Sequence, residues 1–162
     1  MTRLMHYQDH PVDFDRTRTY TQPPADPFGK PTGFWVSVEG DDDWPSWCQS
    51  EDFRTESLSH PHEVRLVPAA NVWWLTTIAD VDRFHMRFSR RRISDRRISD
   101  SWSVIDWRSV AALYDGVIIA PYQRSRRELD WYYGWDCASG CIWNLDAIAS
   151  VEQVAIEAGA AW

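Results

Sequence analysis

Tryptophan content is the feature that most constrains how this chain can fold, since 11 of its 162 residues are Trp. Each indole has a large apolar face and one N–H group that needs a hydrogen-bond partner once it is buried. The length favours one domain, and such a domain removes roughly 70% of its unfolded surface from water. A core of that size cannot take in so many indoles, so we expect several to lie at the surface or along a cleft.

The densest aromatic segment surrounds a single acid. Between Trp131 and Trp143 the chain has five aromatic residues and one carboxylate, that of Asp136. A buried carboxylate without a partner is costly, so this composition is poorly suited to a plain core. It suits a pocket that stacks a flat ring and holds one negative charge against a developing cation, and Asp136 is therefore the candidate for chemistry.

Charge and cysteine content argue against several classes of protein. The net charge of −7 disfavours a protein held to nucleic acid or to a membrane by bulk charge. Three cysteines fit neither a disulfide framework nor a zinc site, which predicts a reducing, cytoplasmic location. The sequence has no apolar run of signal-peptide length at its start, and none near the ~20 residues of a membrane-spanning helix. We therefore expect no membrane among its partners.

The pattern of elements favours a single α+β domain over residues 1–162, with its core at about 3–148. Strands are expected at residues 3–7, 33–38, 62–67, 72–75, 117–120 and 141–144. Helices are expected at residues 43–56, 77–88 and 105–114, and a helix or tail at 147–160. Residues 15–33 are polar and rich in Pro and Thr, and a loop of that length is usually functional or mobile.

Two of the predicted helices have clear start signals. Asp43 precedes Trp44 and Pro45, which is a capping residue followed by proline in the first turn. Thr76 or Thr77 is expected to cap the next helix. Four apolar residues of that helix are spaced for one buried face: Ile78, Val81, Phe84 and Phe88.

A basic five-residue segment, Arg91–Asp95, is repeated at once as Arg96–Asp100. A repeat this short is typical of a surface loop that tolerated an insertion. The alternative is a loop that binds phosphate, because Arg is suited to bidentate phosphate contacts. Seven of the 17 basic residues lie between Arg83 and Arg97.

Four features follow one another in a set order along the chain. The first is an early strand that ends in His6-Tyr7 and is followed by Pro11-Val12-Asp13-Phe14, and the second is the aromatic strand at 33–37 after the long loop. The third is a strand-turn-helix run from Glu63 to Phe84. The fourth is Tyr114-Asp115-Gly116-Val117, followed by Asp136 just before the strand at 141–143. In this order the chain resembles the ADP-ribosyltransferase superfamily, in particular small, divergent bacterial and phage members such as an anti-CRISPR ADP-ribosyltransferase. The resemblance spans roughly residues 3–148.

The resemblance implies both a fold and a binding site. In that family two small antiparallel sheets, with short flanking helices, form a cleft that binds NAD. His6 matches the residue that holds the NAD ribose, and Ser37 matches the position of a middle motif at a strand end. The aromatic candidates for stacking on nicotinamide are Tyr7, Trp35 and Trp135.

Asp136 matches the family's acid that contacts the nicotinamide ribose, where Glu is more usual. Cleavage of the bond between nicotinamide and ribose creates an oxocarbenium-like centre, which a nearby carboxylate stabilises. The same carboxylate can orient or deprotonate the incoming nucleophile. An aromatic face attracts the cationic nicotinamide ring, and a neutral His6 can hydrogen-bond a ribose hydroxyl. None of these roles needs a metal.

The implied function is NAD-dependent mono-ADP-ribosyl transfer to a macromolecular acceptor, protein or nucleic acid, by a toxin, an effector or a phage counter-defence protein. A NAD glycohydrolase would use the same site with water as the acceptor. The non-catalytic alternative is a Trp-rich module that stacks on a nucleotide or nucleic acid, with the Arg83–Arg97 region at the phosphates. Weaker candidates are Glu128 as a rival acid, Cys137 or Cys141 as a nucleophile, and a metal at His60 and His62.

Overall fold

The computed structural model of the chain describes residues 2–25, 29–93 and 101–155. Over these residues the fold is α+β, as the sequence predicts, with a mixed seven-stranded sheet, a separate two-stranded sheet and few helices. The strands are β1 (Leu4–Gln8), β2 (Phe34–Val38), β3 (His60–Leu66), β4 (Val72–Leu75), β5 (Ser89–Ile93), β6 (Ser101–Ile105), β7 (Gly116–Ile119), β8 (Ser139–Ile142) and β9 (Ile148–Gln153). The helices are α1 (Trp44–Glu51), α2 (Ile78–Phe88) and α3 (Trp107–Ala111), with 3₁₀ turns at Thr55–Ser59, Arg124–Arg126 and Leu145–Ala147.

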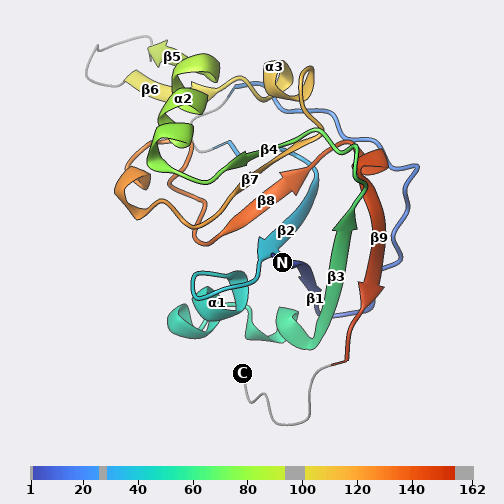
Figure 1. Cartoon of the computed structure of the whole chain (residues 1–162). Helices are drawn as coiled ribbons and strands as arrows, with labels where there is room; N and C mark the ends of the chain where they lie inside the picture. Colours follow the sequence, from blue (N-terminus) through green and yellow to red (C-terminus); the bar gives the residue numbers. More distant parts are fainter. Residues whose placement is uncertain (1, 26–28, 94–100, 156–162) are drawn as a thin grey trace.

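The large sheet has the order β4-β7-β8-β2-β1-β3-β9. Its two halves are joined by a short seam between β1 and β2, where the register includes only the pairs Leu4↔Val38 and Met5↔Ser37. From His6 onward β1 pairs with β3 alone. Figure 1 shows the consequence, because β4, β7 and β8 run across the molecule while β3 and β9 run along its side in a clearly different direction.

This arrangement differs from the two separate antiparallel sheets that the resemblance implies. The halves stay hydrogen-bonded to each other at the seam, so the sheet is continuous. In addition β4 and β7 are parallel. The chain between them passes through α2, the β5–β6 hairpin and α3, and a crossover of that length is what a parallel pair requires.

Each face of the sheet carries its own hydrophobic core, because side chains alternate along each strand. On one face Trp35 of β2 packs with residues of α2 and α3. The neighbouring residues Phe34 and Val36 belong to the core on the opposite face. The first core holds most of the large aromatic side chains, including Phe84, Trp107, Trp131, Trp135 and Trp143.

The tryptophans divide between core and surface. Four are buried: Trp107, Trp131, Trp135 and Trp143. The other described ones are half-buried: Trp35, Trp44, Trp47, Trp73, Trp74 and Trp102. The buried indoles are accommodated by contacts with one another, as in the pair Trp107–Trp135 at 6.3 Å between ring centroids. The expectation that several indoles would stay at the surface or along a cleft is therefore confirmed.

Both predicted helix starts are confirmed. The Asp43 side chain accepts a hydrogen bond from Ser46 N at 2.9 Å, with Pro45 in the first turn of α1. Thr77 caps α2 in a full capping box with Asp80. α2, the longest of the three, has 11 residues, and no helix in the described part of the chain has the length and apolar character that crossing a bilayer requires.

The capping box of α2 leads to a stability prediction. Thr77→Ala removes the hydroxyl that accepts from Asp80 N at 3.1 Å. We expect a loss of about 1 kcal/mol in the free energy of unfolding. Urea denaturation measures it, with the exposed Thr55→Ala as the matched control. Equal midpoints for the two variants would contradict the prediction.

Some elements differ from their prediction, and one hairpin was not expected at all. The helix expected at 105–114 is shorter, because Ile105 ends β6 and Asp106 caps α3. In the segment expected to be a helix or tail (147–160), residues 148–153 form β9, which pairs with the outer edge of β3. The β5–β6 hairpin was not expected; β5 includes residues 91–93 of the repeated basic segment, and the rest of that segment (residues 94–100) lies outside the described residues.

Candidate active site

A pocket of about 330 Å³ opens where β1 and β2 separate. Its walls come from residues 5–8 of β1, residues 35–37 of β2 and the loop at 134–137 that precedes β8. The six site residues that the family resemblance implies all line it: His6, Tyr7, Trp35, Ser37, Trp135 and Asp136. The early strand and the late acid, about 130 positions apart in the chain, therefore meet at one cavity.

Asp136 lies at the rim of this pocket, with its side chain exposed to water. Its loop is anchored on both sides, since Trp135 N donates to Tyr132 O at 2.8 Å and Ala138 N donates to Asp42 O at 2.7 Å. The carboxylate therefore has a defined place without the desolvation cost of burial.

The idea that the aromatic stretch encloses the acid is wrong. Trp131 and Tyr132 are fully buried and Trp135 is 1% exposed, so these rings form part of the plain core. They turn inward against α2 and α3, where large apolar surfaces are removed from water, and Asp136 is left outside.

His6 spans the gap between the diverging strands. Its Nδ1 donates to Trp35 O at 2.7 Å, which leaves Nε2 to accept from the Gln8 amide at 3.3 Å. The ring stacks on Phe34 with 4.3 Å between centroids. Burial lowers the pKa of His6, so the imidazole is neutral. Because both ring nitrogens already have partners within the protein, His6 is placed to shape the pocket by holding β1 against β2.

The lowered pKa of His6 predicts a dependence of stability on pH. An unfolded His takes up a proton near pH 6.5, whereas the folded one resists it. The stabilisation is therefore complete above that pH and is lost as the pH falls through the lowered folded pKa. In His6→Asn, which keeps a side-chain N–H for Trp35 O but cannot titrate, we expect a smaller acid-induced loss of stability.

Urea unfolding at about pH 7.5 and about pH 5.5 measures this difference, because these two values lie on either side of the reference pKa of His. The exposed His10→Asn is the control, and it should lose stability with acid as much as the wild type does. An unchanged acid dependence in His6→Asn would contradict the assignment.

The aromatic residues of the pocket differ in exposure. Trp35 is half-buried and lies beneath the Lys30 ammonium, whose Nζ is 5.4 Å from the ring centroid. The Trp135 ring meets the Trp35 ring edge-on, with 5.0 Å between their centroids. The Nε1 atom of Trp135 is buried and has no hydrogen-bond partner among the described residues. Burial raises the pKa of Tyr7, so its phenol stays protonated. Trp35 and Tyr7 are therefore better placed than Trp135 to meet a flat ring.

Ser37 connects the pocket to α1. Its side chain is buried, and its Oγ accepts from Trp44 N, the first residue of the helix, at 2.9 Å. This contact brings Trp44 into the lining of the pocket. The residue therefore fixes where α1 begins relative to β2.

Two cations of the pocket were missed in the sequence. Lys30 is exposed and lies against Gly134, where an added Cβ would be 2.9 Å from Lys30 Cε. Arg54 also lines the pocket, and its own backbone is left-handed, with a φ of 48°. Lys30 had a signal, because it is the only lysine and lies in the long loop expected to be functional. Arg54 had none.

The loop that carries Lys30 is tied to the core. Trp107 Nε1 donates to Gly29 O at 2.9 Å, and Arg108 Nε donates to Gln22 O at 3.3 Å. The Gln22 side chain in turn makes two hydrogen bonds with the backbone of Thr32, at 2.7 and 3.0 Å. The loop is therefore bonded to α3 before Lys30, and after Lys30 it is bonded to Gln22 of the same loop.

Of the weaker sequence candidates only Cys137 lines this pocket, whereas Cys141, His60 and His62 do not. Glu128 and the described residues from Arg83 to Arg91 are not among its lining. Burial raises the pKa of Cys137 to about 12, and burial also raises the pKa of Cys141 well above its usual value, so neither thiol is a thiolate at neutral pH. Within the part of the chain that the structure describes, no three His, Cys, Asp or Glu residues form a group able to hold a metal ion.

Comparisons with models of protein families, with curated proteins and with solved structures found no match to this chain.

Proposed function

We propose that the chain is a NAD-dependent mono-ADP-ribosyltransferase that transfers ADP-ribose to a macromolecular acceptor. The observation that carries the proposal is the convergence of Asp136, the Trp35 and Tyr7 rings and two cations on one pocket. NAD has a flat cationic ring, two ribose groups and a diphosphate, and each has a chemical counterpart there. Lys30 and Arg54 match the diphosphate, a role the sequence had suggested for a different basic region.

The proposed chemistry needs one well-placed negative charge. The bond between nicotinamide and ribose breaks with its electrons leaving on nicotinamide, and positive charge develops on the ribose. Asp136 at the pocket rim stabilises that charge. The acceptor then forms the new bond to the ribose carbon and gives up its proton to Asp136 or to water. His6 contributes by holding the seam, through its bond to Trp35 O.

The test is incubation of the pure protein with NAD labelled in its adenylate part, with and without a cell lysate. We expect release of free nicotinamide, and label attached to protein or nucleic acid when the lysate is present. Digestion with protease and with nuclease separates the two kinds of acceptor. Neither free nicotinamide nor label transfer, beside an active transferase as positive control, would refute the proposal.

A NAD glycohydrolase is the second candidate, and the exposure of Asp136 favours it, because water reaches the acid directly. Release of nicotinamide and free ADP-ribose, with no label on any macromolecule, identifies it. The non-catalytic binding module would hold the nucleotide and release neither product. A role as a toxin, effector or phage counter-defence protein is part of the proposal and rests on the family resemblance, and the cytoplasmic setting rests on the cysteine content.

A further inference from the structure

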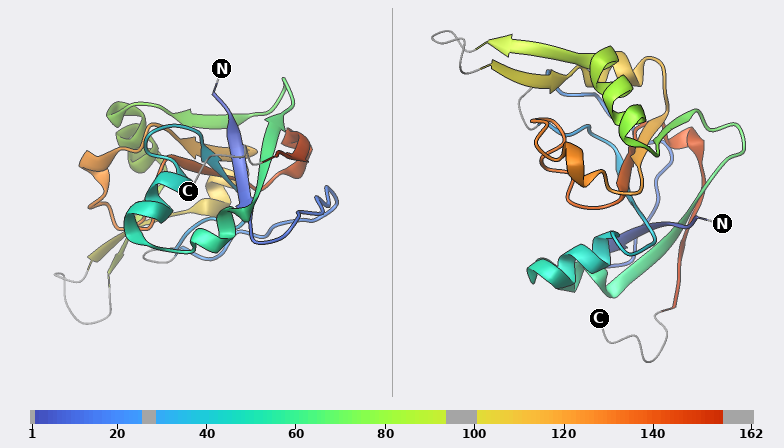
Figure 2. Two further views of the ribbon diagram at one scale, coloured as in Figure 1. Left: turned by 90° about the horizontal axis from the view of Figure 1, so that it is seen from below. Right: turned by 60° about the vertical axis from the view of Figure 1, so that its left-hand side comes forward.

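The most distinctive surface next to the pocket is an aromatic patch at α1, formed by Trp44, Trp47 and Phe53. The two indoles stack with 5.2 Å between ring centroids, and Phe53 meets them edge-on at 6.4 and 5.3 Å. Phe53 is 45% exposed and both indoles are half-buried. α1 lies at the end of the molecule away from the β5–β6 hairpin (Figure 2). Grouped apolar surface of this kind is typical of an interaction site.

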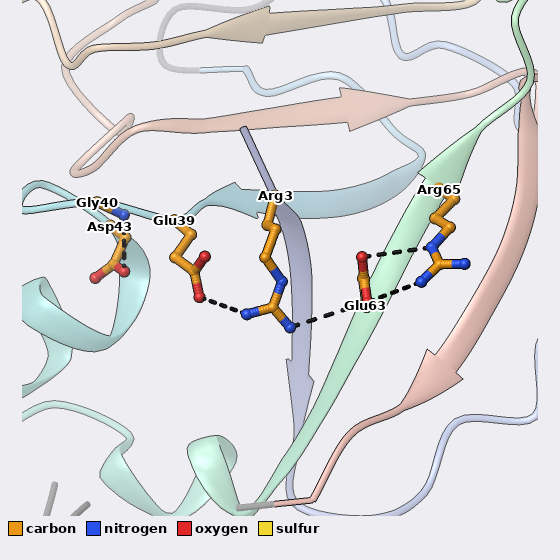
Figure 3. A network of polar contacts seen from close by, with 6 residues as sticks. All are labelled: Arg3, Glu39, Gly40, Asp43, Glu63 and Arg65. Atoms are coloured by element: carbon orange, nitrogen blue, oxygen red, sulfur yellow. Dashed lines mark hydrogen bonds and ion pairs between the residues drawn. The ribbon is translucent and has the colours of Figure 1, made fainter. Parts of the chain in front are cut away.

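Negative charge is concentrated around this patch. Residues 39–56 have seven carboxylates and a single cationic side chain, that of Arg54, so they carry six of the chain's seven net negative charges. Part of this charge is already used within the protein. Figure 3 shows Glu39 paired with Arg3 at 2.9 Å and Asp43 bonded to Gly40 N. Asp42 accepts from Tyr122 N.

The remaining carboxylates of residues 39–56 are not engaged in such contacts. Asp41, Glu51, Asp52 and Glu56 are exposed, and they form no ion pair with any residue in the described ranges. Glu51, Asp52 and Glu56 are close in sequence to Phe53, on either side of it. The aromatic patch therefore lies in an uncompensated negative field, which attracts cations and repels polyanions.

We propose that the aromatic patch is the docking surface for the acceptor, and that the acceptor is a protein presenting a basic segment rich in Arg or Lys. Guanidinium and ammonium groups are attracted both to indole faces and to carboxylates. A nucleic acid would meet repulsion from the same carboxylates. The inference rests on the proposed function for its meaning, because docking supplies the acceptor of the transfer.

The patch is continuous with the pocket. Trp44 belongs to both, and its backbone is bonded to Ser37 of the pocket wall. A partner lying on α1 is thereby brought to the rim where Asp136 is exposed. Aromatic residues at the centre of a contact, with charges around them, are a common arrangement at interfaces.

Fluorescence anisotropy with a labelled peptide of alternating Arg and Gly tests the docking. The first variant combines Glu51→Gln, Asp52→Asn and Glu56→Gln, none of which lines the pocket. We expect it to bind the peptide about tenfold more weakly at low salt, with added salt weakening the wild type toward the variant. The second variant, Phe53→Ala, should weaken binding without changing the charge. Neither should change the rate of nicotinamide release from NAD.

The matched control removes the same charge elsewhere, with Glu128→Gln, Asp146→Asn and Glu152→Gln, all exposed and outside the pocket. It should bind the peptide as the wild type does. Equal loss in both triple variants, no loss in the first, or tighter binding of a single-stranded DNA than of the peptide would overturn the proposal. A wild type that binds the peptide through α1 but never cleaves NAD would refute the proposed function and leave the docking surface standing.

Discussion

Asp136→Asn is expected to slow nicotinamide release from NAD by about 10²- to 10³-fold, which is the usual effect of removing one group that stabilises transition-state charge. The substitution keeps the shape of the side chain and removes its negative charge. Because the carboxylate is exposed, its loss should change the free energy of unfolding by no more than about 0.5 kcal/mol. The KM for NAD should change little, since the charge acts on the ribose cation that forms during bond cleavage.

The control for this experiment is Asp146→Asn, an exposed acid ten positions later that lies outside the pocket. It should leave both the rate and the stability at wild-type levels. Nicotinamide release is measured by chromatography and unfolding by urea titration on the same preparations. A full rate in Asp136→Asn would remove the acid from the mechanism, and a large loss of stability would show that it is a structural residue.

Trp107→Ala is expected to have the largest effect on stability, a loss of about 3–5 kcal/mol. Trp107 is 1% exposed, and its ring lies between 5.8 and 6.4 Å from those of Phe84, Trp131, Trp135 and Trp143. Truncation removes this packing and leaves a cavity among four aromatic rings. It also removes the hydrogen bond to Gly29 O, next to Lys30.

Urea denaturation of Trp107→Ala checks the size of the loss, with Met86→Ala on α2 as the control because that side chain is 82% exposed. Trp107→Phe keeps an aromatic ring in the core but loses the N–H and part of the indole volume. We expect it to lose less stability than Trp107→Ala and to bind NAD more weakly, because Gly29, next to Lys30, loses its hydrogen bond to α3 while Arg108 still holds Gln22. Unchanged binding in a folded Trp107→Phe would show that this loop needs no such anchor.

Local patterns in the sequence were sufficient for much of the secondary structure. β-branched and aromatic runs predict β2, β4 and β7, and the capping signals at Asp43 and Thr77 predict where α1 and α2 begin. These features depend on residues within a few positions of one another. β9 was not predicted, because its strand form depends on pairing with β3, more than 80 positions earlier.

The composition of the pocket was predicted only in part. His6 and Asp136 were chosen from the order of motifs, and both line one cavity. The orientation of His6 toward Trp35 O depends on where β1 and β2 separate, which no local pattern specifies. Arg54 lines the pocket from the segment after α1, whose position depends on tertiary contacts such as that of Ser37 with Trp44, so its place was not visible in the chain.

The sequence by itself determined the α+β class, the helix starts and the set of residue types available to a binding site, because these follow from side-chain chemistry and short-range periodicity. The tertiary structure decided which aromatic rings are buried, where the sheet opens and which charges meet there. Those outcomes depend on the balance of apolar burial and charge solvation across the whole fold. That balance turned Trp131 and Tyr132 inward, left Asp136 in water at the rim, and brought Lys30 and Arg54 to the pocket from two distant loops.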